Sequence, residues 1–152
     1  MMTIELSSIA QQQHRLIHDI YVLLDDGDRQ VLETTDLTPL EFAVLRRLDA
    51  RDGRRMTDVG AELLCVKSTI TRVVDRLERA ALLARMPDPD DRRAQRLTLT
   101  YLGVEVLQKA LHLHDEAVER RMALLSPAEQ TQLVKILAKL RHGLQQDLGH
   151  ES

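Results

Sequence analysis

The sequence predicts a mainly α-helical protein with one small β-hairpin, and three observations support this fold class. Apolar residues recur at helical spacing along most of the chain, two Ser/Thr-Pro-x-Glu segments mark helix starts, and one short alternating segment follows a turn rich in proline and aspartate. Aromatic residues make up only 2% of the chain, so Leu, Val, Ile and Ala must build the core. At 152 residues, with 43% hydrophobic and 30% charged, we expect one globular domain over residues 1–152.

The N-terminal segment is predicted to form an amphipathic helix from Glu5 to Leu24. Its apolar residues fall on one helical face: Ile9, Leu16, Ile17, Ile20, Leu23 and Leu24. The run Asp25-Asp26-Gly27-Asp28 favours a turn, because Asp-Gly pairs are common in turns. We therefore expect the helix to end there, or to kink and resume through Val31 and Leu32.

The middle of the chain has the pattern of a helix-turn-helix. Thr38-Pro39-Leu40-Glu41 is a capping box that starts a helix running through Leu48 and ending at residues 51–53. Thr57 is predicted to cap a short helix that buries Val59 and Leu63, and residues 64–67 form a turn. A second helix then opens at Lys67 or Ser68 and faces inward with four apolar residues, Ile70, Val73, Val74 and Leu77.

A β-hairpin, or wing, is expected next. Residues 82–86 and 95–99 have strand character, and Pro87-Asp88-Pro89-Asp90-Asp91 between them continues neither element. Leu97 and Leu99 should lie on the buried face of the hairpin, and Arg96 and Thr98 on its solvent-exposed face. The order of helix, turn, helix and wing predicts a winged helix-turn-helix core over residues 38–103.

Two long helices complete the chain. Thr100 can cap a helix through Val118, and Ser126-Pro127-Ala128-Glu129 starts the last helix, whose apolar stripe contains Leu133, Ile136, Leu137, Leu140 and Leu144. The first and last helices have apolar stripes with no obvious partner in a small monomer. We therefore predict that residues 1–35 and 104–148 form a dimerisation region that joins two copies as a homodimer.

The charge distribution favours a nucleic-acid partner although the net charge is −3. From Arg54 to Arg96 the chain has ten Lys/Arg and seven Asp/Glu, whereas the rest has eleven Lys/Arg and seventeen Asp/Glu. Positive charge is thus concentrated on the second helix and the wing, while the acidic remainder would be repelled by phosphates and help to orient the molecule.

The candidate DNA-binding residues lie on this second helix and on the wing. Arg72 could pair with a guanine edge, Arg76 lies a turn later where a phosphate is the better partner, and a guanidinium at the wing tip suits a narrow minor groove. The full set is Lys67, Ser68, Thr69, Thr71, Arg72, Arg76, Asp91, Arg92 and Arg93. The alternative is an ordinary solvated helix followed by a turn in which Asp88, Asp90 and Asp91 neutralise the arginine pair.

These residues resemble the MarR family of bacterial transcriptional regulators. Asp91-x-Arg93, five residues and then Leu99-Thr100 is similar to the wing signature of that family, and residues 68–78 resemble its recognition helix. The resemblance implies a homodimer on a pseudo-palindromic operator, with Arg93 in the minor groove and Arg72 in the major groove. The chain departs from the family pattern at Gly60, where Ala is usual, at Ala81, where Gly is usual, and in the glycine-free turn 64–66.

The predicted function is sequence-specific binding of double-stranded DNA by a transcriptional regulator, a repressor released by a small-molecule or oxidative signal. A winged-helix module that binds protein and not DNA is the alternative. The sequence contains none of the common catalytic motifs, so we expect no enzyme activity and no cofactor. Residues for a small-molecule effector pocket are Leu16, Ile20, Tyr21, Phe42 and Leu45, with plain core packing as the alternative.

The cysteine and histidine residues are candidate sensors, and cysteine content and hydropathy predict the cellular compartment. Cys65 could sense oxidation or be a buried small hydrophobe, and His14 with His18 are too few ligands for metal, so no metal is predicted. A metal-dependent enzyme using these histidines is the third reading. The single cysteine, the absence of an export signal in residues 1–10 and the lack of a long apolar run predict a cytoplasmic protein without a membrane partner.

Overall fold

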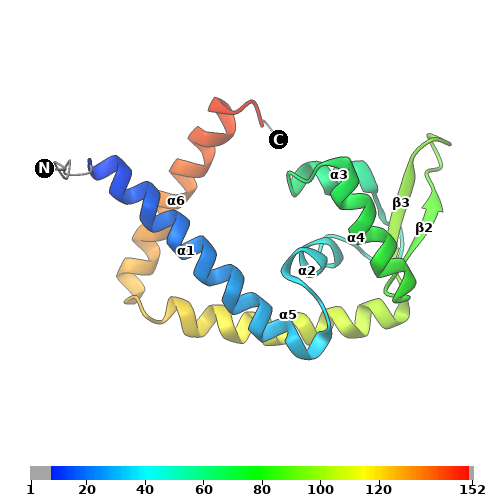
Figure 1. Cartoon of the computed structure of the whole chain (residues 1–152), viewed down its shortest axis with the longest axis horizontal. Helices are drawn as coiled ribbons and strands as arrows, with labels where there is room; N and C mark the ends of the chain where they lie inside the picture. The colour runs from blue at the N-terminus through cyan, green and yellow to red at the C-terminus, as the bar shows by residue number, and fades with distance from the viewer. Residues whose placement is uncertain (1–7, 151–152) are drawn as a thin grey trace, which may run out of the picture. The chain divides into compact units, whose positions relative to one another are not determined.

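The computed structural model describes residues 8–150, and it shows a winged helix-turn-helix with long helices on both sides in the sequence (Figure 1). The structure divides into two units, with the boundary between His114 and Asp115 inside the fifth α-helix. The elements are α1 (Ile9–Leu32), a 3₁₀ turn (Glu33–Thr35), α2 (Pro39–Leu45), β1 (Arg54–Arg55), α3 (Met56–Glu62), α4 (Lys67–Arg79), β2 (Leu83–Pro87), β3 (Gln95–Leu99), α5 (Tyr101–Met122) and α6 (Pro127–Asp147). This order confirms the predicted fold class.

Helix α1 passes through the segment where a break was expected. Ser8 caps its start in a capping box with Gln11, whereas Glu5 lies outside the described residues. The predicted end at residues 25–28 is wrong, and the alternative, a helix that runs on through Val31 and Leu32, is the one observed; Leu32 is fully buried. Arg29 pairs with Asp25 and Gln30 with Asp26, each four residues apart, and such pairs stabilise a helix that carries an internal glycine.

The helix-turn-helix begins as predicted but differs at its element ends. The capping box of Thr38 and Glu41 is formed, with Pro39 as the first helical residue. Helix α2 ends at Leu45 and not Leu48, since residues 46–48 tighten into shorter-range turns. Helix α3 starts at Met56 with Arg55 as its N-cap, so the prediction that Thr57 caps it is wrong.

The wing belongs to a three-stranded antiparallel sheet of order β1-β3-β2. Strand β1 was not predicted; it pairs Arg54 with Leu97 and Arg55 with Arg96. Leu97 is buried as expected, but Thr98 is also buried, which corrects its predicted exposure. Gly53, in the loop that leads into β1, packs directly against Thr98: a Cβ atom built on Gly53 would lie only 2.7 Å from Cγ2 of Thr98. This loop therefore covers the Thr98 side chain.

The core of the first unit is built from aliphatic residues of α1, α2, α3, α4, the sheet and α5. The four predicted inward residues of α4 are all buried, as are Val59 and Leu107, whereas Leu63 is only partly buried. Phe42 is the one phenylalanine of the chain, and it also lies in this core. The predicted pattern of the helix-turn-helix core is therefore confirmed.

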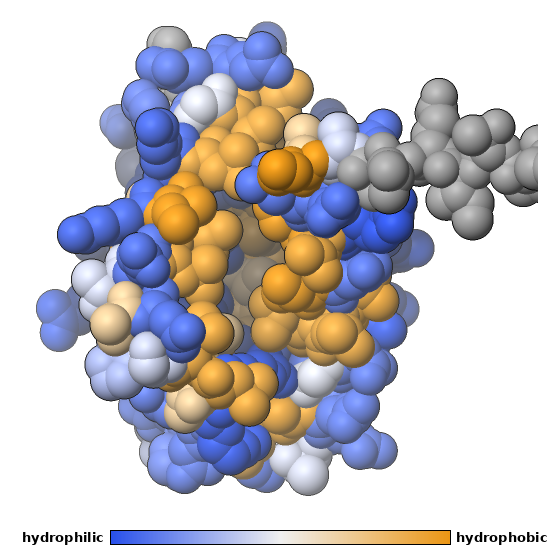
Figure 2. Space-filling view, turned by 90° about the vertical axis from the view of Figure 1, so that its left-hand side faces the viewer, coloured by the Kyte–Doolittle hydropathy of each residue, from blue (hydrophilic) through white to orange (hydrophobic). Residues whose placement is uncertain are grey.

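The flanking helices keep large apolar surfaces exposed. On α1 the exposed set is Ile9, Leu16, Ile17, Ile20, Tyr21, Val22 and Leu23, and Figure 2 shows apolar side chains gathered on the face that carries this helix. On α6, which starts at the predicted capping box of Ser126 and Glu129, no residue is buried, and Ile136, Leu137, Leu140 and Leu144 are exposed. Within residues 8–150, no helix has the length and apolarity needed to cross a bilayer.

One glycine fixes the approach of α5 to the end of α4. A Cβ atom at Gly103 would lie 1.9 Å from the backbone oxygen of Leu82, so Gly103→Ala must push two backbones apart. We expect this variant to lose roughly 1–3 kcal/mol of unfolding free energy, as overpacked cores do. Urea unfolding followed by circular dichroism measures the loss.

The matched control is Gly60→Ala in α3. A Cβ there would meet Ile70 no closer than 3.4 Å, which is an ordinary contact. We expect a gain of roughly 0.5–1 kcal/mol, because alanine restricts the unfolded chain and favours helix. Equal effects of the two substitutions would contradict the assigned packing of Gly103.

Candidate nucleic-acid interface

Helix α4 presents a polar and basic outer face. Its inner face is buried, and Lys67, Ser68, Arg72 and Arg76 are exposed, with Thr69 and Thr71 half-buried beside them. Among residues 8–150, Arg72 and Lys67 make no ion pair or side-chain hydrogen bond. The exposed face of the N-terminal half of α4 thus carries donors that can reach another molecule.

Arg76 has a structural partner in addition to its exposed surface. Its guanidinium pairs with Glu41, a carboxylate that is only 4% exposed, and also donates to the backbone oxygen of Asp36 at 3.3 Å. Glu41 in turn accepts from the backbone amide of Thr38 at 3.1 Å. Arg76 therefore holds α4 against the start of α2, and half of its side chain remains open to solvent.

A second arginine ties α4 to the wing. Arg85 on β2 pairs with Asp75 and lies 3.6 Å from Glu78, both on α4. Between the two elements Ala81 adopts a left-handed conformation with φ of 60°, so alanine here takes the backbone geometry for which the family pattern uses glycine. The orientation of the wing relative to α4 is thus set by an ion pair and by a turn.

The wing tip holds two arginines outward. Asp91 accepts a hydrogen bond from the backbone amide of Arg93 at 2.9 Å, and the amide of Ala94 donates to the backbone oxygen of Asp91 at 3.0 Å. Arg92 and Arg93 are exposed, and neither has an ion pair with any residue between 8 and 150. Asp91 therefore shapes the tip through the backbone amide of Arg93.

The base of the wing depends on Asp88, whose role the sequence did not reveal. Its carboxylate accepts from Nε of Arg55 at 2.9 Å, Nη2 of Arg55 at 3.1 Å and Nη1 of Arg96 at 2.9 Å. It also accepts from the backbone amides of Asp90 and Asp91 at 2.9 and 3.0 Å. The hydrogen bonds from Arg55, followed by those from Arg96 and Asp90, hold the pKa of Asp88 well below its usual range.

Asp88 therefore does not neutralise the arginine pair of the tip. Its oxygens are occupied by Arg55 and Arg96, which come from β1 and β3. This arrangement disfavours the alternative of a self-neutralised turn, because the buried carboxylate belongs to the base of the wing. The charges of Arg92 and Arg93 stay available at its tip.

A loop before β1 secures the other side of the wing. Arg96 donates to the backbone oxygens of Asp52 at 3.0 Å and Gly53 at 3.3 Å. The Asp49 carboxylate accepts from the amides of Gly53 and Arg51, and these backbone hydrogen bonds lower the pKa of Asp49. Gly53 has a φ of 69° and no room for a Cβ, so the loop fits only glycine there.

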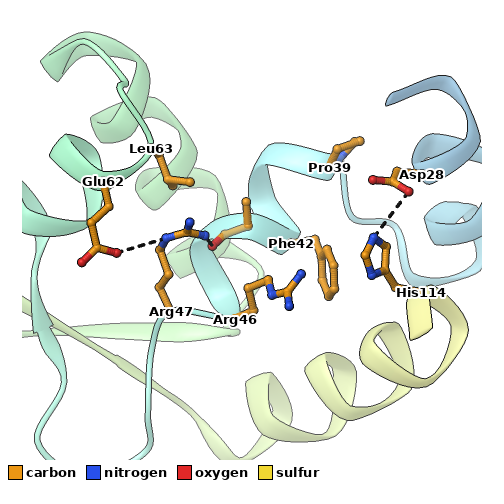
Figure 3. A pocket seen from close by; sticks show the side chains of 9 residues that line it. Asp28, Pro39, Phe42, Arg46, Arg47, Glu62, Leu63 and His114 are labelled. Carbon is orange, nitrogen blue, oxygen red and sulfur yellow. Dashed lines mark hydrogen bonds and ion pairs between the residues drawn. The ribbon is translucent and has the colours of Figure 1, made fainter. Parts of the chain in front are cut away.

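A pocket lies within the first unit, on the α2 side of the core. It has a volume of about 580 Å³ and is lined by Asp28, Pro39, Phe42, Ala43, Arg46, Arg47, Glu62, Leu63 and His114 (Figure 3). The rings of Phe42 and His114 lie 5.0 Å apart, and the Arg46 guanidinium lies 5.3 Å from the centre of the Phe42 ring. Nε2 of His114 lies 3.4 Å from the Asp28 carboxylate.

The five residues predicted for an effector pocket are not brought together there. Phe42 lines this pocket, but Leu45 is fully buried in the core. Leu16, Ile20 and Tyr21 are 60%, 52% and 65% exposed on α1. Sequence reasoning missed Arg46 and Arg47, which follow the end of α2, and His114, which lies within α5. No local pattern predicts that these distant residues meet.

Cys65, His14 and His18, the candidate redox and metal sensors, lie outside this pocket. Cys65 is half-buried against the core, with Sγ 3.7 Å from the backbone oxygen of Leu63. His14 and His18 line a shallow hollow along α1. The part of the chain that the structure describes contains no group of three potential metal ligands.

The fold and this interface define a class: winged helix-turn-helix proteins with a basic second helix and a basic wing tip. Residues 37–94 match the family model described as "MarR family". An uncharacterised helix-turn-helix transcriptional regulator, YkoM from Bacillus subtilis (strain 168), is 41% identical over 101 residues, which cover 66% of each chain. The chain belongs to the MarR family and is a transcriptional regulator of that family.

Solved structures agree with this assignment. AbsC, a MarR family transcriptional regulator from Streptomyces coelicolor, is 28% identical, with a TM-score of 0.82 over 94% of this chain and 99% of that one. The transcriptional repressor CouR, solved bound to a 23-mer DNA duplex, is 25% identical, with a TM-score of 0.78 over 91% of this chain and 99% of that one.

The buried Asp88 carboxylate should govern the stability of the wing. In Asp88→Asn the two guanidinium groups lose the charge that they share, so we expect faster amide hydrogen exchange at residues 95–97 and a thermal midpoint several degrees lower. Asp90→Asn is the matched control, because its side chain is exposed while its backbone amide still donates to Asp88. Equal exchange in the two variants would contradict the role of Asp88.

The same carboxylate makes stability depend on pH in one direction. Because its folded pKa is depressed, its stabilisation is fully present above the unfolded pKa of about 4 and is lost as the pH falls towards the folded value. We therefore expect the difference in unfolding free energy between the wild type and Asp88→Asn to be constant from pH 7 to about 5 and to shrink below about 4. A difference that grows on acidification would contradict this assignment.

Proposed function

We propose that this regulator binds double-stranded DNA by placing the N-terminal half of α4 in a major groove and the wing tip in the adjacent minor groove. The observation that carries the proposal is the exposure of Arg72, Arg92 and Arg93 without an ion pair among residues 8–150, while neighbouring arginines are paired internally. The similar repressor CouR was solved bound to a 23-mer DNA duplex, which supports DNA as the partner.

The residues divide into three roles. Arg72 reads a guanine edge, and Ser68, Thr69 and Thr71 contact bases or phosphates beside it. Lys67 and the exposed part of Arg76 bind phosphate. Arg92 and Arg93 enter a narrow minor groove, where negative potential is concentrated, and Asp91 keeps the tip in shape through the amide of Arg93.

We also propose that the protein acts as a homodimer on a pseudo-palindromic operator. The support is the exposed apolar stripe on α1 and the one on α6, since contiguous exposed apolar side chains mark interaction sites in water-soluble proteins. A two-fold dimer would place two α4 helices in successive major grooves about 34 Å apart.

The dimer is tested by Leu140→Glu, with Lys139→Glu as the matched control. Leu140 belongs to the exposed stripe of α6, whereas Lys139 is its exposed polar neighbour. We expect light scattering at micromolar concentration to give a dimer mass for wild type and Lys139→Glu and a monomer mass for Leu140→Glu, since a buried charge without a partner is costly. A monomeric wild type would contradict the proposal.

The proposed regulation is repression that a small molecule relieves. The pocket beside Phe42 supports this proposal, because it combines an aromatic ring, two arginines and a histidine in a volume that suits a small ligand. By linkage, a ligand that weakens DNA binding must itself bind less tightly when DNA is present. A molecule that occupies the pocket and leaves DNA affinity unchanged would contradict this regulation.

The DNA-binding proposal predicts distinct effects for two arginines. On DNA selected from a random pool, Arg72→Ala should weaken binding roughly tenfold or more and relax the sequence preference at one position per half-site. Arg93→Ala should weaken binding roughly tenfold and reduce the slope of affinity against salt, because it removes a cation from the groove. Fluorescence anisotropy at two salt concentrations measures both effects.

Lys109→Ala is the control, because this exposed cation on α5 lies outside α4 and the wing. It should leave affinity and sequence preference unchanged. If no sequence is enriched and the two arginine variants behave like Lys109→Ala, the DNA-binding proposal is contradicted and the alternative of a winged helix that binds protein is favoured.

A further inference from the structure

The turn between α3 and α4 exposes two apolar side chains beside the proposed DNA-contacting residues. Leu64 is 67% exposed and Val66 is 66% exposed, whereas Cys65 between them packs against the core. Val66 directly precedes Lys67 and Ser68, which are exposed and polar. The apolar turn, which we define as Leu64 and Val66, is therefore continuous with the outer face of α4.

Leu64 is an unfavourable residue for its backbone conformation. It has a φ of 51°, in the left-handed region. The amide of Leu64 donates to the oxygen of Ala61 and the amide of Cys65 to that of Gly60, which is the hydrogen-bond pattern of a helix end that normally uses glycine. A leucine there destabilises the turn, and its exposed side chain gains little burial in return.

Val66 is an unfavourable residue for its position at the helix start. It is the N-cap of α4 and makes no side-chain hydrogen bond to the first turn. Ser, Thr, Asp and Asn are preferred there because their oxygens accept from the free amides, and valine cannot do so. Two residues of one turn thus both lower local stability and both expose apolar groups at the edge of the same surface.

Such local penalties are common where a side chain serves binding. The major groove of DNA has one apolar feature, the C5-methyl group of thymine. In a helix-turn-helix, residues at the N-terminal end of the second helix approach the base edges. An exposed valine at this end has the chemistry to contact a thymine methyl group, whereas a serine cap does not.

We propose that the apolar turn is a specificity determinant, in which Val66, supported by Leu64, contacts a thymine methyl group in each operator half-site. The inference rests on the proposed DNA binding and adds a base preference to it. It predicts that sites selected from a random pool contain a thymine that the wild type prefers. It also predicts that selection with Val66→Ser loses this preference.

The test compares one selected site made with thymine and the same site made with deoxyuridine, which lacks only the methyl group. We expect the wild type to bind the deoxyuridine site more weakly, roughly fourfold for each methyl group that is buried. Val66→Ser and Leu64→Gly should bind the two sites equally. Both variants should be at least as stable as the wild type, because serine is a better N-cap and glycine suits a positive φ, so misfolding cannot explain the result.

Arg93→Ala is the matched control for the change of DNA. It should weaken binding to both sites but keep the wild-type ratio between them, because its proposed contact lies in the other groove. Salt-dependent binding by the wild type with equal affinity for both sites would overturn this inference alone. An unchanged ratio in Val66→Ser would overturn it too, and an absence of any enriched site would overturn it together with the DNA-binding proposal.

Discussion

Asp88 accepts hydrogen bonds from two guanidinium groups and from two backbone amides of the wing tip. Arg55 comes from β1 and Arg96 from β3, so one buried carboxylate joins the strand that precedes α3 to the hairpin itself. A buried carboxylate is stable only when its acceptors are filled. The position of the exposed tip therefore depends on a charge that the solvent does not reach.

The arginines of the chain divide into those that hold the fold and those that remain available. Arg55 and Arg96 meet Asp88, Arg76 meets Glu41, and Arg85 meets Asp75. Arg72, Arg92 and Arg93 are exposed and form no ion pair among residues 8–150. A chain with a net charge of −3 can still present a basic surface, because Lys and Arg outnumber Asp and Glu by ten to seven between Arg54 and Arg96.

Features set by neighbours in sequence could be predicted, and features set by distant residues could not. The capping boxes at Thr38 and Ser126 depend on residues three apart, and both were predicted and are present. Strand β1 and the contact of Arg55 with Asp88 join residues more than thirty positions apart, and no periodicity reveals them. At Gly27 the local turn signal was overridden, because side-chain pairs and the burial of Leu32 favour a continuous helix.

Ala81 and Leu64 both lie in turns where glycine is expected, but their surroundings differ. Ala81 has a positive φ, but its backbone oxygen accepts a hydrogen bond from the Thr100 hydroxyl at 2.6 Å, and the next residue packs against Gly103. Tertiary contacts thus offset its backbone strain. Leu64 has a similar φ, and backbone hydrogen bonds close its turn, yet its side chain is mostly in solvent. The proposed contact with a thymine methyl group gives this exposed leucine a role that packing within the described residues does not supply.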